Sequence, residues 1–477
     1  MNSTQLQSTS TNQLWKISFP LMISFLSLFT MVFVDRIFLS FYSTKALNAA
    51  TSAGTLGWSL ILGFSTLAGL AEVFVAQYNG AKLFEKLAEP IWQMIWLSFF
   101  SILFFIPLGI FGGYFLYGHP HPSNYEFDYF RYTLFLSPAA ILLAALTAFF
   151  VGQGKTSIIK WLGVIGNIVN VILDPLFIFG WKDLIPSMGV KGACLASGIG
   201  ILVQALILVC LFFKKENIEK YGILDWKFKP AVFYQCIKVG LPPAIFVFIE
   251  LLGWSIFYWM MTQVSQEHIL VASICQSILL LFIFFGLGLE KGAAVIAGNL
   301  IGAGLIDSIP KLLKSGVKLL SIFSLFILFF FVIYPDFLIE IFFKHPEALD
   351  IDILSSSLSP ERIYSLKNQV RSGLALIAIY MIVEDCRWLI NGILTAAGDT
   401  FFLMICGASC VWFFLLIPTY FFVVKGQGSI QTAFYIWIIY SLIALAFFYI
   451  RFKQGKWREK CVLIEKSEDL IIEEKPF

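Results

Sequence analysis

Acidic side chains occur inside long apolar segments of this chain. Asp35, Asp174 and Glu250 each directly follow an apolar residue, namely Val34, Leu173 and Ile249. A carboxylate at membrane depth is costly and is therefore a functional hypothesis by default. A group of this kind can hold a cation, or it can gain and lose a proton during a catalytic or transport cycle.

Three oxygen-bearing side chains of the N-terminal half form the first candidate site. Asn170 and Asp174 are four residues apart and so share one helix face. Together with Asp35 they could converge on one sodium ion or share one proton. Two structural alternatives are open: Asp35 and Arg36 could form a solvated pair near a helix end, and Asp174 before Pro175 could cap or kink its helix.

The second candidate site lies in the C-terminal half. Glu250 has no cation within one turn of its own segment, which suits a group that exchanges protons. Glu384 and Asp385 are consecutive and point about 100° apart on a helix. We therefore expect only one of them to face the central cavity, while the other could pair with Arg387.

Other residues of the apolar segments have competing interpretations. Glu290 and Lys291 are neighbours and are expected to neutralise each other, whereas Glu72 is ambiguous. Three tryptophans could stack on a flat cationic substrate, although packing between helices is the alternative: Trp58, Trp254 and Trp259.

Membrane-spanning helices must position these groups. A chain of 477 residues with 59% hydrophobic and 13% charged residues cannot be one soluble globular protein. Apolar runs long enough to cross the hydrocarbon core as a helix occur twelve times. The first six are at roughly 14–42, 50–79, 91–117, 132–152, 157–180 and 188–213; the second six are at roughly 237–264, 269–300, 311–343, 372–396, 402–424 and 430–452.

The two halves of the chain repeat each other. Residues between 16 and 83 recur 222 positions later, among them Lys16 as Lys238, Pro20 as Pro242, Gly80 as Gly302 and Leu83 as Leu305. An insertion at 344–371 lengthens the shift to 244, so that Gly154 recurs as Gly398. Repeats of this kind usually face each other across a central cavity where substrate and ion bind.

We therefore predict an all-α integral membrane protein of twelve transmembrane helices in two six-helix bundles related by a pseudo-two-fold axis. The predicted parts are an N-terminal tail at 1–13, an N-lobe at 14–213, a linker at 214–236, a C-lobe at 237–452 and a C-terminal tail at 453–477. Lys and Arg outside the spans are concentrated on the side of both termini, which the positive-inside rule places in the cytoplasm.

Several classes of function are excluded. The segment ending in Gly154-Lys155-Thr156 lacks a phosphate-binding loop, since Phe149 stands where that motif needs glycine. The four histidines fall in loops and form no H-E-x-x-H motif. The net charge of +3 gives no indication of nucleic acid. We expect a monomer that is not an enzyme, has no cofactor, contacts membrane lipid and small organic molecules, and takes its energy from an ion gradient.

Several segments resemble the MATE (multidrug and toxic compound extrusion) family of antiporters. They are Phe33-Val-Asp-Arg-Ile-Phe38, Val75-Ala-Gln-Tyr-Asn-Gly-Ala81, the stretch 166–180, Gly240-Leu-Pro242, Asn299-Leu-Ile-Gly-Ala-Gly304 and the stretch 392–400. The resemblance runs from about residue 14 to 450. It implies a V-shaped exporter with alternating access.

The resemblance also implies roles for individual residues. Asp35, Asn170 and Asp174 match the family's N-lobe cation or proton site. Glu250 matches a glutamate of the seventh span in other branches, and Glu384 or Asp385 falls near an acid of the tenth span. The usual L-R-G-x-x-D-T reads Leu-Thr-Ala-Ala-Gly-Asp-Thr at 394–400, so the branch and the choice between proton and sodium stay open.

The expected function is ion-coupled multidrug efflux: secondary active export of amphipathic, cationic organic compounds across the plasma membrane. A lipid-linked oligosaccharide flippase of the same superfamily is the alternative. It would be expected to have a basic cavity, whereas we count only Arg36, Lys291 and Arg387 as intramembrane basic residues. An integral membrane enzyme is a further alternative, which lacks a catalytic constellation.

Overall fold

The protein is described from a computed structural model that covers residues 6–119, 121, 124–182, 184–344 and 360–460. These residues are almost entirely helical, apart from one isolated bridge between Trp181 and Ile185. The all-α prediction is confirmed. Much of the predicted insertion at 344–371 and most of the predicted tail at 453–477 lie outside the described residues.

Helices α2 to α9 form the N-lobe. Their bounds are α2 (Thr11–Tyr42), α3 (Thr44–Gly69), α4 (Ala71–Gly80), α5 (Ala88–Pro107), α6 (Gly113–Tyr117), α7 (Tyr125–Gly152), α8 (Thr156–Ile178) and α9 (Val190–Phe212). Helix α4 continues the direction of α3 after a turn at Leu70, and a π-helical turn at Leu108–Gly112 joins α5 to α6. Short helix α10 (Lys215–Tyr221) follows the lobe.

Helices α11 to α19 form the C-lobe. Their bounds are α11 (Pro230–Val264), α12 (Gln266–Leu280), α13 (Phe284–Gly302), α14 (Ile309–Leu328), α15 (Pro335–Lys344), α17 (Pro360–Ala396), α18 (Thr400–Ser409) and α19 (Ile430–Gln454). π-Helical segments extend α14 over Phe329–Ile333 and α18 over Cys410–Leu416 and Thr419–Lys425.

Twelve helical runs of the described chain have the length of a membrane span, as predicted. Eleven are long and apolar enough by composition. The twelfth is α17, whose 37 residues include the charged Glu384, Asp385 and Arg387. Several helices begin earlier than the apolar runs predict, since α3 begins at Thr44, α7 at Tyr125 and α17 at Pro360. Polar first turns carry these helices beyond the apolar run, and capping side chains such as Ser43 and Asn124 fix their starts.

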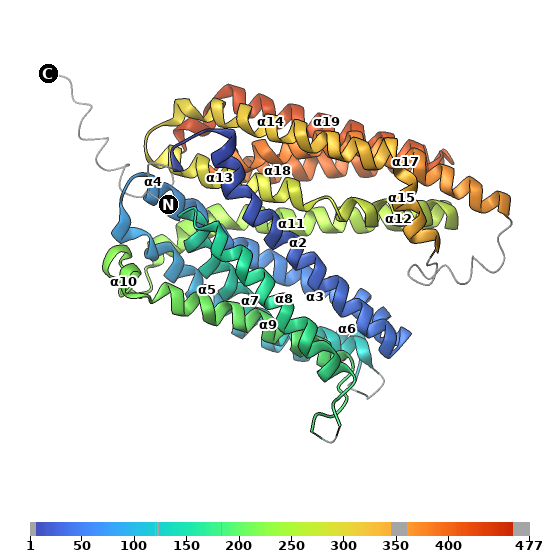
Figure 1. Ribbon diagram of the computed structural model, residues 1–477, viewed down its shortest axis with the longest axis horizontal. Coiled ribbons are helices and arrows are strands. Elements are labelled where there is room, and N and C mark those ends of the chain that lie inside the picture. Colours follow the sequence, from blue (N-terminus) through green and yellow to red (C-terminus); the bar gives the residue numbers. More distant parts are fainter. Residues whose placement is uncertain (1–5, 120, 122–123, 183, 345–359, 461–477) are drawn as a thin grey trace.

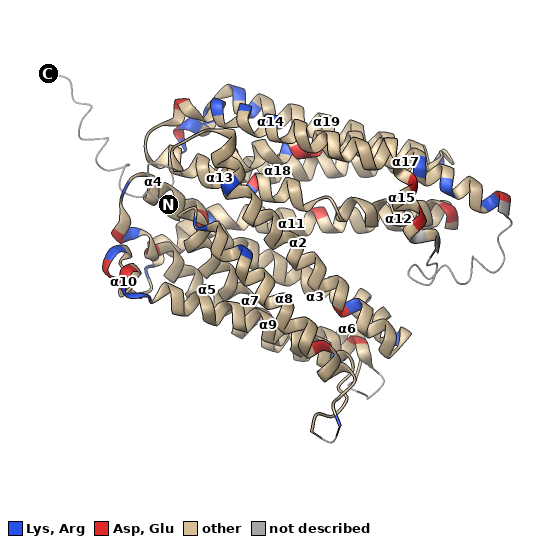
Figure 2. Cartoon of the chain, viewed as in Figure 1, with Lys and Arg blue, Asp and Glu red and all other residues tan. Residues whose placement is uncertain are grey.

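The two lobes meet at one end and diverge at the other, which gives the molecule the shape of a V (Figure 1). Helix α2 begins and α19 ends at the joined end, whereas α2 ends and α12 begins at the open end. Charged residues gather near the helix ends, and only a few lie midway along the helices (Figure 2).

Close backbone contacts hold the joined end together. Helices α4 and α13 cross there, with Gly80 against the main chain of Asn299 and Gly302 against the main chain of Gln77. A Cβ atom at either glycine would collide with that main chain. Gly80 and Gly302 are equivalent in the repeat, as are Gln77 and Asn299, so one contact is present twice.

Candidate functional site

The three predicted residues of the N-lobe meet in the structure. Helices α2 and α8 pack together, and Asn170 Nδ2 donates to Asp35 Oδ1 at 2.8 Å and to Asp174 Oδ1 at 3.3 Å. Ser197 Oγ of α9 donates to Asp35 Oδ2 at 2.5 Å. Asp35, Asn170 and Asp174 are all buried, so the alternative of a solvated pair between Asp35 and Arg36 is wrong.

This cluster has acceptor oxygens without donors. Asn170 Oδ1 and Asp174 Oδ2 are buried and have no hydrogen-bond partner among the described residues. The Asp35 and Asp174 carboxyl groups lie within hydrogen-bond reach of each other. Buried acceptors without donors cost free energy, which a shared proton or a bound cation would offset. The arrangement is therefore suited to reversible binding of a small cation.

Ser197 is the member of this cluster that sequence reasoning missed. Serines are common at helix contacts in membranes, so its type alone gives no signal. Glycines near it bring α9 close to α8, since a Cβ on Gly200 would lie 3.0 Å from the carbonyl oxygen of Gly166. That glycine pattern was the available indication that α9 reaches the Asp35 site.

The C-lobe site is a cluster of charges around Arg387. Arg387 forms an ion pair with Glu384, and both side chains are buried. The guanidinium also lies 5.4 Å from the centre of the Phe448 ring. The charges of Arg387, Glu384 and Glu290 all act on Glu250. Glu250 has no cation within one turn of α11, as expected. Helix α17, however, brings the charge of Arg387 to bear on it from across the C-lobe.

The structure divides the roles of Glu384 and Asp385. Glu384 is the acid that pairs with Arg387, and its Oε2 atom is buried with no hydrogen-bond partner among the described residues. Asp385 is also buried and faces Gly286 of α13. Two buried tyrosines that the sequence did not single out, Tyr380 and Tyr440, lie within reach of the same charges.

Lys291 pairs across the lobes, with Glu72 of α4 at 2.5 Å. The charges of Glu290 and Lys291 act on each other, as expected, but the ion pair of Lys291 is with Glu72. Glu290 instead accepts a hydrogen bond from Asn391 Nδ2 at 2.6 Å. Glu72, which was ambiguous in the sequence, is thus half of an interlobe ion pair.

The three tryptophans differ in environment. Trp254 packs edge-on against Trp437 with ring centres 4.8 Å apart. Trp259 is 59% exposed, and Trp58 is half-buried. Trp254 is thus part of the packing of the C-lobe. Contact of any of the three with a substrate stays a prediction.

Near the joined end, a layer of hydrogen bonds also joins the lobes, in addition to the ion pair of Glu72 with Lys291. Gln77 Nε2 donates to the Ala396 carbonyl at 2.8 Å. Asn299 Nδ2 donates to the Gly152 carbonyl at 3.1 Å, and Asn79 Nδ2 donates to Asn299 Oδ1 at 2.7 Å. All three side chains are buried. We call Gln77, Asn79 and Asn299 the interlobe layer.

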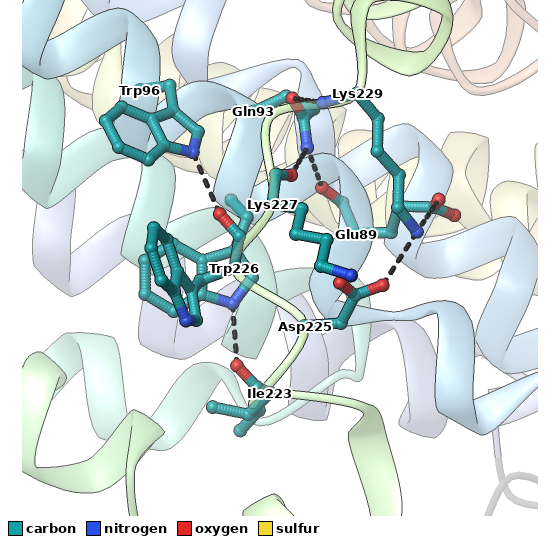
Figure 3. A network of polar contacts seen from close by, with 9 residues as sticks. Glu89, Gln93, Trp96, Ile223, Asp225, Trp226, Lys227 and Lys229 are labelled. Carbon is teal, nitrogen blue, oxygen red and sulfur yellow. Dashed lines mark hydrogen bonds and ion pairs between the residues drawn. The ribbon is translucent and has the colours of Figure 1, made fainter.

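The segment between the lobes is attached to α5 of the N-lobe (Figure 3). Gln93 Oε1 accepts from the Lys229 main-chain nitrogen at 3.0 Å, and the Lys229 ammonium contacts Glu89 at 2.7 Å and Asp225 at 2.8 Å. Hydrogen bonds to Asp225 and Glu89 raise the pKa of Lys229, and the bond to Lys229 lowers the pKa of Asp225. Lys229 and Asp225 therefore both stay charged at neutral pH. The attached segment ends at Lys229, directly before α11 begins at Pro230.

Comparison with known proteins agrees with this architecture. The MatE family model matches residues 20–176 and 242–421. The chain is 24% identical over 438 residues to a probable multidrug resistance protein NorM of Thermotoga maritima, covering 90% of this chain and 89% of that protein.

Two solved structures share the fold at 15% identity, covering 96% of this chain and 99% of theirs. They are a multidrug resistance MATE family transporter in an outward-facing conformation, with a TM-score of 0.81, and a MOP superfamily transporter from Pyrococcus furiosus, with a TM-score of 0.80.

Proposed function

Because the chain belongs to the MatE family, we propose that it is a multidrug exporter that exchanges amphipathic organic cations for protons across the plasma membrane. The observation that carries this proposal is the buried cluster of Asp35, Asn170 and Asp174, in which Asn170 Oδ1 and Asp174 Oδ2 have no donor among the described residues. The probable multidrug resistance protein NorM of T. maritima, which is similar along most of its length, supports the same substrate class.

The contacts between the lobes support alternating access. The interlobe layer and the pair of Glu72 with Lys291 lie between α4, α13 and their neighbours near the joined end. Rocking of the two lobes would break these contacts and bring the opposite ends together. With both termini in the cytoplasm, as the positive-inside rule predicts, the V opens to the outside.

The acids give exchange a physical basis. A protonated carboxyl has no charge to attract a cation, so protonation from outside would weaken substrate binding and favour release. Loss of the proton to the cytoplasm would restore the negative charge and favour capture of the next substrate. Two carboxyl groups within hydrogen-bond reach, Asp35 and Asp174, are suited to hold one proton between them.

Transport in inverted membrane vesicles tests the proposal. Ethidium, a fluorescent organic cation, should accumulate when the vesicle interior is acidic. Accumulation should collapse with a protonophore and persist when sodium is replaced by potassium. The reverse pattern would make the chain a sodium antiporter with the Asp35 cluster as its sodium site. No accumulation under either gradient would contradict organic-cation export itself.

A further inference from the structure

One face of α3 is polar although it is exposed. Asn48, Thr51, Ser52 and Thr55 are exposed, and Ser59 continues the same face as a half-buried residue. The opposite face consists of small residues packed on α7, such as Gly54 against Tyr129. We call the exposed set, Asn48, Thr51, Ser52, Thr55 and Ser59, the α3 polar stripe.

The stripe differs from the faces that this protein turns to lipid. Exposed positions of α5 are apolar, with Phe99 52% and Leu103 77% exposed. Lipid gives no hydrogen bonds to polar side chains, so a polar exposed face in a membrane protein generally lines a space that water reaches. Helix α3 also packs against α11 of the other lobe, which places it on the inner side of the V.

Each hydroxyl group of the stripe donates its hydrogen bond to a main-chain carbonyl of α3. Thr51 Oγ1 donates to the Leu47 carbonyl at 3.0 Å, Thr55 Oγ1 to the Thr51 carbonyl at 2.6 Å, and Ser59 Oγ to the Thr55 carbonyl at 2.7 Å. Ser52 Oγ donates in the same way to the Asn48 carbonyl at 3.0 Å. A hydroxyl has one proton and two lone pairs. The hydroxyls of the stripe therefore offer acceptors, and they carry no charge.

The repeat places matching hydroxyls on the other lobe. Thr51 and Thr55 recur after 222 positions as Ser273 and Ser277 of α12, and Ser277 Oγ donates to the Ser273 carbonyl at 2.9 Å. The N-caps of the two helices, Ser43 and Ser265, are also equivalent. In Figure 1, α3 and α12 lie on the sides of their lobes that face the opening of the V.

We propose that the α3 polar stripe binds the N–H groups of organic cations that carry them, such as amines, anilines and guanidines, on their way between the lobes. A line of hydroxyl oxygens that accept hydrogen bonds fits a ligand whose polar groups only donate them. Because these oxygens carry no charge, they hold a cation loosely enough to release it. Thr51 and Asp35 each lie seven residues, about 10 Å, from the turn between α2 and α3. Thr51 of the stripe is therefore level with Asp35, one of the acids that would complete capture.

The inference rests on the proposed export function and adds to it a preference among cations. The test compares two probes in inverted vesicles containing the full chain: ethidium, which carries amino groups, and tetraphenylphosphonium, which has no N–H group. The variants are Thr51→Val, Thr55→Val and Ser277→Ala. The control is Ser321→Ala on α14, where an exposed hydroxyl donates to the Val317 carbonyl in the same way.

Each threonine change should raise the KM for ethidium about threefold to tenfold and leave the KM for tetraphenylphosphonium unchanged. The Ser321→Ala control should leave the KM for both probes unchanged. Ser277→Ala should act in the same direction. Equal losses for both probes, or no loss for either, would overturn the role of the stripe. Absence of transport of both probes by the unaltered chain would instead contradict the proposed export function.

Discussion

Gln77 and Asn299 occupy equivalent positions of the two repeats, and each donates a hydrogen bond to a main-chain carbonyl of the opposite lobe. Their acceptors, Ala396 and Gly152, are equivalent as well, since they differ by the shift of 244 that follows the insertion. The contact is thus reciprocal. A rocking motion that separates the lobes at this end must break both bonds together, which favours two distinct conformations over a continuous range.

The first prediction concerns the interlobe layer. Asn299→Leu should leave the Asn79 amide and the Gly152 carbonyl without partners, at a cost of about 1–3 kcal/mol to this conformation. The population with the lobes separated at this end should rise about tenfold. Spin labels at the exposed, equivalent Leu83 and Leu305 would measure it as a longer distance. Unchanged distances in Asn299→Leu would show that the layer does not hold the lobes together.

The second prediction concerns the pair of Glu72 with Lys291. Lys291→Met leaves the buried Glu72 without its cation; since the Lys291 side chain is 34% exposed, we expect a loss of about 1–2 kcal/mol, less than for a fully buried pair. The midpoint of thermal unfolding should fall clearly. The double change Glu72→Gln with Lys291→Met should recover most of the loss, because no charge is left unpaired. A double variant no better than the single one would refute the pairing.

The third prediction separates the N-lobe acids from the others. Asp35→Asn should abolish coupled transport, since it removes one of the two carboxyl groups that can share a proton. Glu290→Gln should retain most activity, because its bond to Asn391 can be kept by an amide. Both rates are measured with ethidium at equal protein levels. Equal damage from the two changes would mean that the site has been assigned to the wrong acids.

The repeat and the apolar runs were enough to predict the fold. The shift of 222 identifies two lobes, and the spacing of the runs identifies twelve spans. Neither pattern locates the break between α12 and α13. There the helix is interrupted at Leu281–Ile283 although the apolar run continues. An interruption of this kind depends on packing against neighbouring helices. The equivalent residues of the first repeat, 59–61, remain within α3.

Contacts within a helix were easier to predict than contacts between helices. The four-residue spacing correctly places Asn170 beside Asp174, and the adjacency of Glu384 and Asp385 correctly indicates that one of them pairs with Arg387. The partner of Lys291 and the approach of Arg387 to Glu250 depend on which helices meet. A single sequence does not directly show which helices contact each other.

The fourth prediction concerns Glu250. Glu250→Gln preserves shape and volume and leaves the ion pair of Arg387 with Glu384 in place, so the fold should be kept. Export should lose its dependence on the proton gradient, since the amide cannot titrate. Ethidium efflux from cells and the level of protein in the membrane are measured together. Normal ethidium efflux that a protonophore still abolishes, at a normal protein level, would exclude Glu250 from coupling.

The last prediction concerns the attachment of the linker to α5. Lys229→Met removes both ion pairs of the ammonium but keeps the main-chain bond to Gln93, so the segment before α11 should loosen without detaching. The ammonium is about one third exposed, so we expect a loss of about 1 kcal/mol at most. Hydrogen exchange at residues 222–229 should be faster, because these main-chain groups open more often.

Lys227→Met is the matched control for this change, since Lys227 contributes its carbonyl to Gln93 and that bond does not depend on its side chain. Exchange in the Lys227 variant should equal that of the unaltered chain. The increase caused by Lys229→Met should persist across neutral pH, because the raised pKa of Lys229 and the lowered pKa of Asp225 keep the pair charged there. The indole N–H groups of Trp92 and Trp96 donate to the carbonyls of Ile223 and Trp226. Equal exchange in the two variants would show that these bonds and those of Gln93 hold the linker without help from the ion pairs.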